Sequence, residues 1–394
     1  MSAREDKSIP YGRQNVSEED IDAVVKVLRS EFLTQGPLVP IFENAVAEYC
    51  GAQYAVAVNS ATSALHIACL ALEVGPGDIV WTSPITFVAS SNSALYCGAS
   101  VDFVDIDPRT YNMSVEALAE KLSKAKKSNL LPKVVIPVHL SGQPCDMEGI
   151  YELSTQYGFD IVEDASHALG GSYKGKSIGS GCYSVMSVFS FHAVKMITSG
   201  EGGMVVTNDK HLLKRLQGYR SHGVTSSPND KQPRPDHEIW NYQQLALGFN
   251  YRMTDIQAAL GVSQLKRLDS FVTNRRKIAN SYDQLLEHLP IVIPWQHDDS
   301  YSSYHLYLIK LESSDDKYLQ LRVYNTLRER GVLVNLHYIP VYRQPYYEQL
   351  GFKQGHCPEA EKYFTGILSI PIYPGLSKGD QERVVNILDK ALSL

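Results

Sequence analysis

The stretch AVAVNSATSALHIACLALEV, residues 55–74, has the order of elements expected in a parallel α/β sheet. A short apolar run from Tyr54 to Val58 predicts a buried strand. The polar letters NSATS predict a turn, and an alanine-rich segment with helical spacing follows and ends near Gly75. Strand, polar turn and helix in this order indicate one crossover unit of such a sheet.

The same order recurs in the segments that come next along the chain. Each begins with a short apolar run that changes to polar residues at its carboxyl end. These segments are DIVWTSPITFVASSNSALYCG (78–98), ASVDFVDID (99–107), KVVIPVHLSGQP (133–144) and GFDIVEDASHALGG (158–171). The alternation predicts a mostly parallel, doubly wound sheet, in which ligands bind beyond the carboxyl ends of the strands.

The length of the chain predicts two domains. Its 394 residues exceed the roughly 250–300 at which one hydrophobic core stops growing. A long helical pattern over 253–289 is interpreted as the start of the passage to the second domain. We therefore expect a large domain over 1–255 and a smaller C-terminal α/β domain over 256–394.

Composition excludes several classes of function. Lys and Arg number 37 against 43 Asp and Glu, a net charge of −6, so no basic surface for nucleic acid is expected. The six cysteines are dispersed without a Cys-x-x-Cys pair, which argues against a zinc site and a disulfide framework. No apolar run approaches the ~18 residues of a membrane span, and the polar N-terminal residues do not resemble a secretory signal. A cytoplasmic protein acting on small molecules, with no membrane partner and no metal, is the expectation.

The turn after residue 58 is a candidate phosphate site. Free backbone N–H groups at a helix start favour an anion, and Ser60, Thr62 and Ser63 add hydroxyl groups. Serine and threonine also cap helices without any ligand, so this motif alone does not decide. The chain lacks both the Walker lysine motif and the Gly-x-Gly-x-x-Gly fingerprint, which disfavours an ATP or dinucleotide site.

Two further residues turn the candidate anion site into a candidate cofactor site. Asp164 ends an apolar run, where it could hold the pyridinium nitrogen of pyridoxal phosphate or merely cap a helix. Lys195 follows about 30 residues later, between the apolar run VFSF and a glycine-rich turn. An exposed loop lysine is the alternative for Lys195 taken alone. A lysine held near that aspartate and a phosphate could form a Schiff base.

Five segments together resemble one enzyme family. EDASHALG, FSFHAVKMITSGEGGMVVTND and GFNYRMTDIQAALGVSQLKRLD resemble the aspartate, lysine and Asn-Tyr-Arg segments of the sugar-nucleotide aminotransferases. FLTQGP near the start and HYIPVYRQPYY near the end extend the resemblance over almost the whole chain. The resemblance implies a fold-type-I aminotransferase dependent on pyridoxal 5'-phosphate, with pyridoxamine phosphate as an intermediate.

The resemblance also implies roles for residues around the cofactor. Lys195 would form the Schiff base and carry the proton, and Asp164 would pair with the pyridine nitrogen. His167 would lie near the phenolic oxygen of the ring, and Phe87 would stack on its face. The remaining cofactor-binding residues would be Ala61, Thr62 and Ser190 at the phosphate, with Asn250 from the neighbouring subunit of a homodimer.

Within the family, the chain most resembles the members of pseudaminic acid biosynthesis. The segments that carry this resemblance are NSATSALH, DASHALG, RSHGV, GFNYRMTDIQAALG and CPEAEKYFTGILSIPIYPGL. These aminate C4 of a UDP-linked 4-keto-6-deoxy-N-acetylhexosamine of L-altro configuration, with L-glutamate as donor. The residues expected at the substrate are Tyr11, Glu31, Phe32, Leu33, Thr34, Ala61, Ser190, Asn250, His337, Tyr338, Ile339 and Pro340. The alternatives are amination of a different keto-deoxy nucleotide sugar at C3 or C4, and a non-catalytic regulatory relative. Dehydration at C3 is disfavoured because those relatives carry His where this chain has Lys195.

Overall fold

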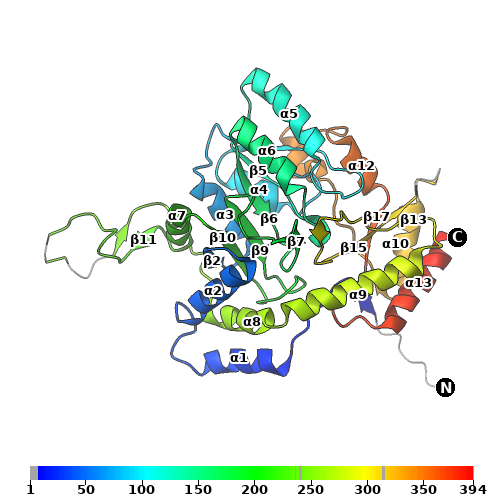
Figure 1. Cartoon of the computed structure of the whole chain (residues 1–394), viewed down its shortest axis with the longest axis horizontal. Helices are drawn as coiled ribbons and strands as arrows, with labels where there is room; N and C mark the ends of the chain where they lie inside the picture. The colour runs from blue at the N-terminus through cyan, green and yellow to red at the C-terminus, as the bar shows by residue number, and fades with distance from the viewer. Residues whose placement is uncertain (1–7, 236, 239–241, 313–315, 394) are drawn as a thin grey trace.

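The computed structural model describes residues 8–235, 237–238, 242–312 and 316–393. It is an α/β protein with a mostly parallel central sheet, which confirms the predicted fold class. A smaller antiparallel sheet and its helices lie at one side, close to the carboxyl end of the chain (Figure 1).

The central sheet has seven strands in the order β2-β10-β9-β6-β5-β3-β4. All neighbours are parallel except β10, which runs antiparallel to both β2 and β9. The strands are β2 (Tyr54–Val58), β3 (Ile79–Thr82), β4 (Ser100–Phe103), β5 (Val134–Ile136), β6 (Asp160–Asp164), β9 (Met186–Ser190) and β10 (Gly203–Thr207). Each apolar run that the sequence predicts to be a buried strand thus forms one.

Both faces of the sheet are covered, because alternate residues of a strand point to opposite sides. Val56 and Val58 pack into one hydrophobic cluster, whereas Ala55 and Ala57 pack into the other. Helices α3, α4 and α7 supply the first cluster, and α2, α5, α6, α8 and the start of α9 supply the second. These helices are α2 (Leu38–Cys50), α3 (Ala61–Ala71), α4 (Ala89–Tyr96), α5 (Val115–Ser128), α6 (Met147–Tyr157), α7 (Lys210–Arg220), α8 (Asp255–Leu265) and α9 (Leu268–Leu286).

Local sequence signals set several helix starts. Helix α1 (Glu18–Leu28) begins after Ser17, whose backbone N–H donates to Asp20 Oδ2 at 2.9 Å. The long helical pattern over 253–289 forms two helices, α8 and α9, with a break at Lys266 and Arg267. Helix α8 packs on α1 and α2 of the large sheet's helical layer, and α9 continues toward the smaller sheet (Figure 1).

The smaller sheet has the order β13-β15-β17 and packs against α9, α10 and α13. The N-terminal strand β1 pairs with β16, which follows α10. Ile9 of β1 is buried in the hydrophobic core around the smaller sheet. The predicted boundary after residue 255 stays a prediction. The elements are β1 (Ile9–Pro10), β13 (Ile291–Val292), β15 (Tyr307–Leu311), α10 (Leu319–Glu329), β16 (Val332–Leu333), α11 (Pro345–Gln349), α12 (Pro358–Phe364), β17 (Ile367–Ile370) and α13 (Lys378–Leu392).

Two smaller pairings join or extend these parts. Strand β14 (Ser300–Tyr301) pairs with β7 (Ser172–Tyr173), which in turn pairs with β8 (Lys176–Ser177). Strands β11 (Val224–Thr225) and β12 (Gln243–Gln244) pair in an arm that extends away from the body (Figure 1). Among the described residues, no helix has both the length and the apolar character needed to span a membrane.

Candidate active site

A cavity of about 1070 Å³ lies beyond the carboxyl ends of β2, β6 and β9, as expected for a doubly wound sheet. Segments from the C-terminal part of the chain close one side of it. Its principal polar and aromatic lining residues are Tyr11, Asn59, Ser60, Thr62, Ser63, Thr86, Phe87, Asp164, Ser166, His167, Ser190, His192, Lys195, Glu201, Gln257, His305, Asn335, His337 and Tyr338. The two candidate residues Asp164 and Lys195 therefore share one cavity.

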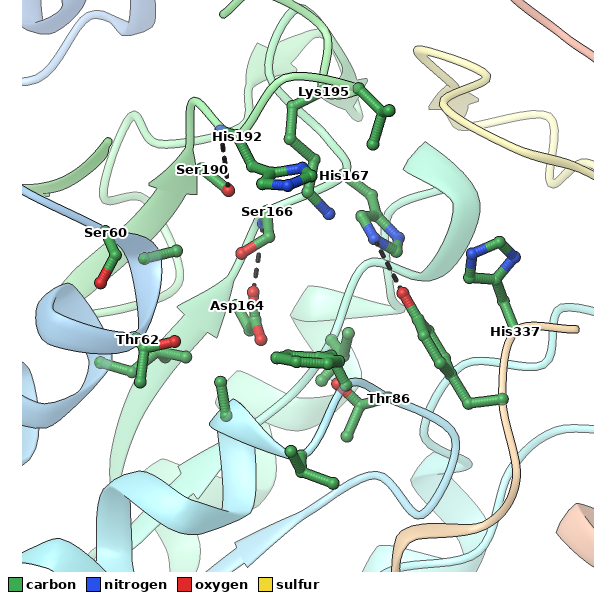
Figure 2. A pocket seen from close by; sticks show the side chains of 18 of the residues that line it. Ser60, Thr62, Thr86, Asp164, Ser166, His167, Ser190, His192, Lys195 and His337 are labelled. Carbon is green, nitrogen blue, oxygen red and sulfur yellow. Dashed lines mark hydrogen bonds between the residues drawn. The ribbon is translucent and has the colours of Figure 1, made fainter. Parts of the chain in front are cut away.

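Asp164 is the last residue of β6 and is only 5% exposed. Its Oδ2 accepts a hydrogen bond from Ser90 Oγ at 2.6 Å, and its Oδ1 accepts one from the Ser166 N–H at 3.2 Å. Its backbone N–H donates to Pro137 O, and its backbone O accepts from the His139 N–H. This carboxylate is thus held in one orientation at the floor of the cavity (Figure 2).

Lys195 follows β9 in a short turn and reaches toward the space between Asp164 and His167 (Figure 2). Desolvation lowers the pKa of its amine to about 8, although the charge of Asp164 acts in the opposite sense. A lysine with this pKa carries a much larger unprotonated fraction near neutral pH than an ordinary lysine. The turn therefore presents a nucleophilic amine to the cavity.

The depressed pKa predicts a distinctive pH dependence for acylation of Lys195 in the cofactor-free protein. Only the unprotonated amine reacts, so the rate should rise about tenfold per pH unit up to about 8 and then level off. The rate for an ordinary exposed lysine continues to rise up to about pH 10.4. Acetic anhydride labelling across this pH range, read by peptide mass spectrometry, measures both. A Lys195 rate that keeps rising to about pH 10.4, as for an ordinary exposed lysine, would contradict the lowered pKa.

The start of α3 forms an anion site at the opposite wall. Ser60 is the N-cap and accepts from the Ser63 N–H, while the Ser63 hydroxyl donates to Asn59. The N–H groups of Ala61 and Thr62 belong to the same first turn and lie at the cavity wall. A Cβ at Gly203 would lie 2.4 Å from the Ser60 carbonyl carbon, so only glycine lets β10 approach this turn. The helix start can therefore receive a phosphate.

The environment of His167 determines which of its nitrogens carries the proton. The Ser141 backbone N–H donates to His167 Nδ1 at 3.3 Å, so the proton is on Nε2, which faces the Tyr338 hydroxyl at 3.4 Å (Figure 2). Burial, followed by the charge of Lys195, lowers the pKa of His167 well below its ordinary value. His167 is thus a neutral hydrogen-bond donor in the cavity wall.

His337 and Tyr338 bring the C-terminal part of the chain to the cavity. The Asn335 amide lies 3.3 Å from His337 Nε2, and His337 Nδ1 lies 2.7 Å from Ser369 Oγ. Burial, followed by the charge of Lys195, lowers the pKa of His337 to about 3. The Tyr11 ring packs against this imidazole at 5.2 Å between centroids. Both nitrogens of His337 are therefore occupied by the protein.

The cavity brings together most of the residues that the sequence and the resemblance predict. Phe87 is 59% exposed, which leaves its ring free to contact a ligand. The predicted residues at the cavity are Tyr11, Ala61, Thr62, Phe87, Asp164, His167, Ser190, Lys195, His337, Tyr338 and Ile339. Their roles toward a ligand stay predictions.

Six predicted residues lie outside the cavity of this chain. Pro340 is buried just beyond its wall. Asn250 is exposed and bridges to Ser221. The other four are Glu31, Phe32, Leu33 and Thr34, of which Phe32 and Leu33 are about half exposed. Their predicted contacts with substrate would need a second copy of the chain or a different loop position.

Sequence reasoning missed two residues of the cavity wall and one residue that supports the wall from behind. Ser90 supports Asp164 although it looks like an ordinary residue of α4. His305 lies in the apolar run SYHLYLIKL, and Asn335 lies between two apolar runs. Only the tertiary fold brings these residues to the site. Within the described chain, no three His, Cys, Asp or Glu side chains are grouped to hold a metal ion.

Comparisons with known proteins agree with this geometry. Residues 14–389 match the model of the DegT/DnrJ/EryC1/StrS aminotransferase family. A spore coat polysaccharide biosynthesis protein of Bacillus subtilis, SpsC, is 35% identical over 98% of this chain and 97% of its own. The UDP-4-amino-4,6-dideoxy-N-acetyl-beta-L-altrosamine transaminase of Campylobacter jejuni is 37% identical over 96% of both chains.

Solved structures of sugar aminotransferases are also similar to this chain. The pseudaminic acid biosynthesis aminotransferase PseC of Helicobacter pylori superposes with a TM-score of 0.88 at 31% identity, over 98% of this chain and 100% of its own. A sugar aminotransferase of Streptococcus pneumoniae in its PLP-form superposes with a TM-score of 0.87 at 28% identity, over 98% of this chain and 99% of its own. The likeness thus extends over the whole fold.

Proposed function

The chain belongs to the DegT/DnrJ/EryC1/StrS family and is a pyridoxal-phosphate-dependent sugar aminotransferase, and we propose that it aminates C4 of a UDP-linked keto sugar. The observation that carries the proposal is the position of Lys195 opposite Asp164 in one cavity that also holds the start of α3. These residues match three of the polar groups of the cofactor, namely its aldehyde, ring nitrogen and phosphate.

The residues present fit this cofactor. Asp164 is a buried carboxylate with a fixed orientation, suited to a protonated ring nitrogen. The Ala61 and Thr62 N–H groups and the Ser190 hydroxyl are suited to the phosphate. Phe87 supplies an exposed aromatic face, and the His167 Nε2–H is suited to the phenolic oxygen.

The catalytic work then divides among residues of this chain. When bound, the cofactor supplies an electron sink for negative charge on the carbon that bears the transferred nitrogen. Asp164 would hold the proton at the ring nitrogen and so keep this sink effective. Lys195 Nζ would carry the proton between the substrate carbon and C4′ of the cofactor, because a pKa of about 8 lets the amine both take up and release a proton. The same lysine serves the donor and the acceptor.

The proposed substrates are L-glutamate and a UDP-linked 4-keto-6-deoxy-N-acetylhexosamine of the L-altro series. The product would be UDP-4-amino-4,6-dideoxy-N-acetyl-beta-L-altrosamine, a precursor of pseudaminic acid. The altrosamine transaminase of Campylobacter jejuni and the PseC structure support this choice. SpsC is nearly as similar, so amination of another keto-deoxy nucleotide sugar is the alternative.

Product identification tests the proposal. The purified protein is incubated with L-glutamate and the L-altro keto sugar, and the product is characterised by mass spectrometry and NMR. The expected product carries its new amino group at C4, with 2-oxoglutarate formed in equal amount. Turnover of a keto sugar of another configuration, without turnover of the L-altro sugar, would support the alternative.

We also propose that the active unit is a homodimer in which Asn250 reaches the cofactor phosphate of the partner. Leu245 and Leu247 are 49% and 79% exposed near this residue, and such apolar surface favours association with a second copy. A cytoplasmic location fits the proposed substrates.

Asn250→Ala should therefore weaken retention of the cofactor about tenfold, the loss expected for one hydrogen bond to a charged group. The measurement is the dissociation constant of pyridoxal phosphate from the dimer, obtained by fluorescence titration. Asn280→Ala, at an exposed position of α9, is the matched control and should leave the constant unchanged. An Asn250→Ala variant with wild-type affinity would count against the contact.

A further inference from the structure

His305 is a buried histidine of the cavity wall, and the proposed mechanism assigns no role to it. It lies just before β15, is 4% exposed and lines the cavity. Its ring packs against His167 with 4.4 Å between centroids. The C-terminal part of the chain thus places a third imidazole beside His167 and His337.

The imidazole of His305 differs from its two neighbours in its hydrogen bonding. His167 and His337 each engage both ring nitrogens with protein groups. Within the described chain, no residue hydrogen-bonds to the His305 ring, and its Nδ1 is buried without a partner. Because Nδ1 is enclosed by the protein, Nε2 is the ring nitrogen that a ligand in the cavity can reach, and it also has no hydrogen-bond partner among the described residues.

Several hydrogen bonds hold the segment around His305 in place. The Arg275 Nη1 group donates to the carbonyl oxygens of Tyr304 and His305, at 3.3 and 3.1 Å. Ser303 Oγ donates to His167 O at 2.7 Å, and the Leu306 N–H donates to Ser141 O. These hydrogen bonds fix the backbone of the segment and so set the position of the imidazole.

The imidazole of His305 is neutral. Burial, followed by the neighbouring His167 and the charges of Lys195 and Arg275, lowers its pKa well below its ordinary value. Arg275 is buried, and in the described chain its Nε also lacks a partner. No arginine lines the cavity in the part of the chain that the structure describes. A ligand carboxylate in this cavity therefore has no guanidinium to bind, and the imidazole of His305 offers it an N–H.

We propose that His305 binds a carboxylate of the amino donor through an N–H of its neutral imidazole. This inference rests on the proposed function, since an amino acid donor must place its amine at Lys195 and therefore brings a carboxylate close to it. The Nε2–H faces the cavity without a protein partner, and a carboxylate there would accept its hydrogen bond. His305 is then a residue that selects the donor.

Glutarate is the probe, because it has the carboxylates of glutamate but no amine to transfer. Its affinity for the holoenzyme is measured by titration calorimetry for the wild type, His305→Phe and His305→Gln. Phenylalanine retains the ring packing against His167 and removes both nitrogens, whereas glutamine retains an N–H donor. His288→Phe, at an exposed position, is the matched control.

Glutarate binding should weaken about tenfold in His305→Phe, recover in part in His305→Gln and stay unchanged in His288→Phe. The apparent KM for L-glutamate should rise in parallel, while that for the keto sugar stays unchanged. Equal glutarate affinity in the wild type and His305→Phe, or no glutarate binding to the wild type, would overturn the inference. So would a change confined to the keto sugar. Failure of the wild type to transfer any amino group would instead reject the proposed function.

Discussion

Lys195→Ala is expected to lower turnover by at least about 10³-fold while the fold and the cofactor cavity remain. Lys195 is the group in the cavity with an amine of lowered pKa next to Asp164, so its removal takes away both the attachment of the cofactor and the proton carrier. The loss should appear in kcat for both half-reactions, since the same amine serves donor and acceptor. Turnover with L-glutamate and the keto sugar, measured at saturating cofactor, checks this.

The unfolding temperature of Lys195→Ala shows whether its loss of turnover comes from the missing amine or from a damaged fold. A buried ammonium is costly in the folded protein, and the pKa of Lys195 lies below its ordinary value, so its charged form destabilises the cofactor-free fold below pH 8. Lys195→Ala should therefore unfold at the same or a higher temperature than the cofactor-free wild type at pH 7. Lys176→Ala, on the exposed strand β8, should retain full turnover. Activity of Lys195→Ala within tenfold of the wild type would reject the assignment.

The sequence predicts the floor of the site better than its walls. Asp164 and Lys195 could be found because each ends or follows a strand of a recognisable parallel sheet, and such strand ends share one edge. The same pattern predicts the α3 start as an anion site. These features depend on local periodicity, which a single chain displays directly.

The walls depend on contacts between distant parts of the chain. Ser90 lies 74 positions from the carboxylate that it supports, and Tyr338 lies 171 positions from His167. The apolar run that contains His305 predicts a strand, but periodicity does not reveal that its histidine faces a cavity. Glu31 to Thr34 and Asn250 follow from the resemblance alone, and this single chain keeps them away from the cavity.

Asp164→Asn is expected to lower kcat about 10- to 1000-fold, with the fold preserved. A carboxylate within hydrogen-bonding distance raises the pKa of a partner base by about one to three units, and the neutral amide does not. Asparagine has the same shape and keeps an oxygen for the Ser166 N–H, so Ser90 and the end of β6 should stay in place. The variant thus removes the charge and little else.

Asp160→Asn provides the matched control, because Asp160 lies on the same strand at its amino end, away from the cavity. Its pKa is raised by burial, so loss of its charge should not destabilise the fold near neutral pH, and turnover should match the wild type.

In Asp164→Asn, the loss should be similar in both half-reactions, since the ring nitrogen is common to them. The visible absorbance of the bound cofactor should show that Lys195 still holds it. A loss that follows cofactor release, and vanishes at saturating pyridoxal phosphate, would assign Asp164 to binding rather than to maintaining the proton on the ring nitrogen.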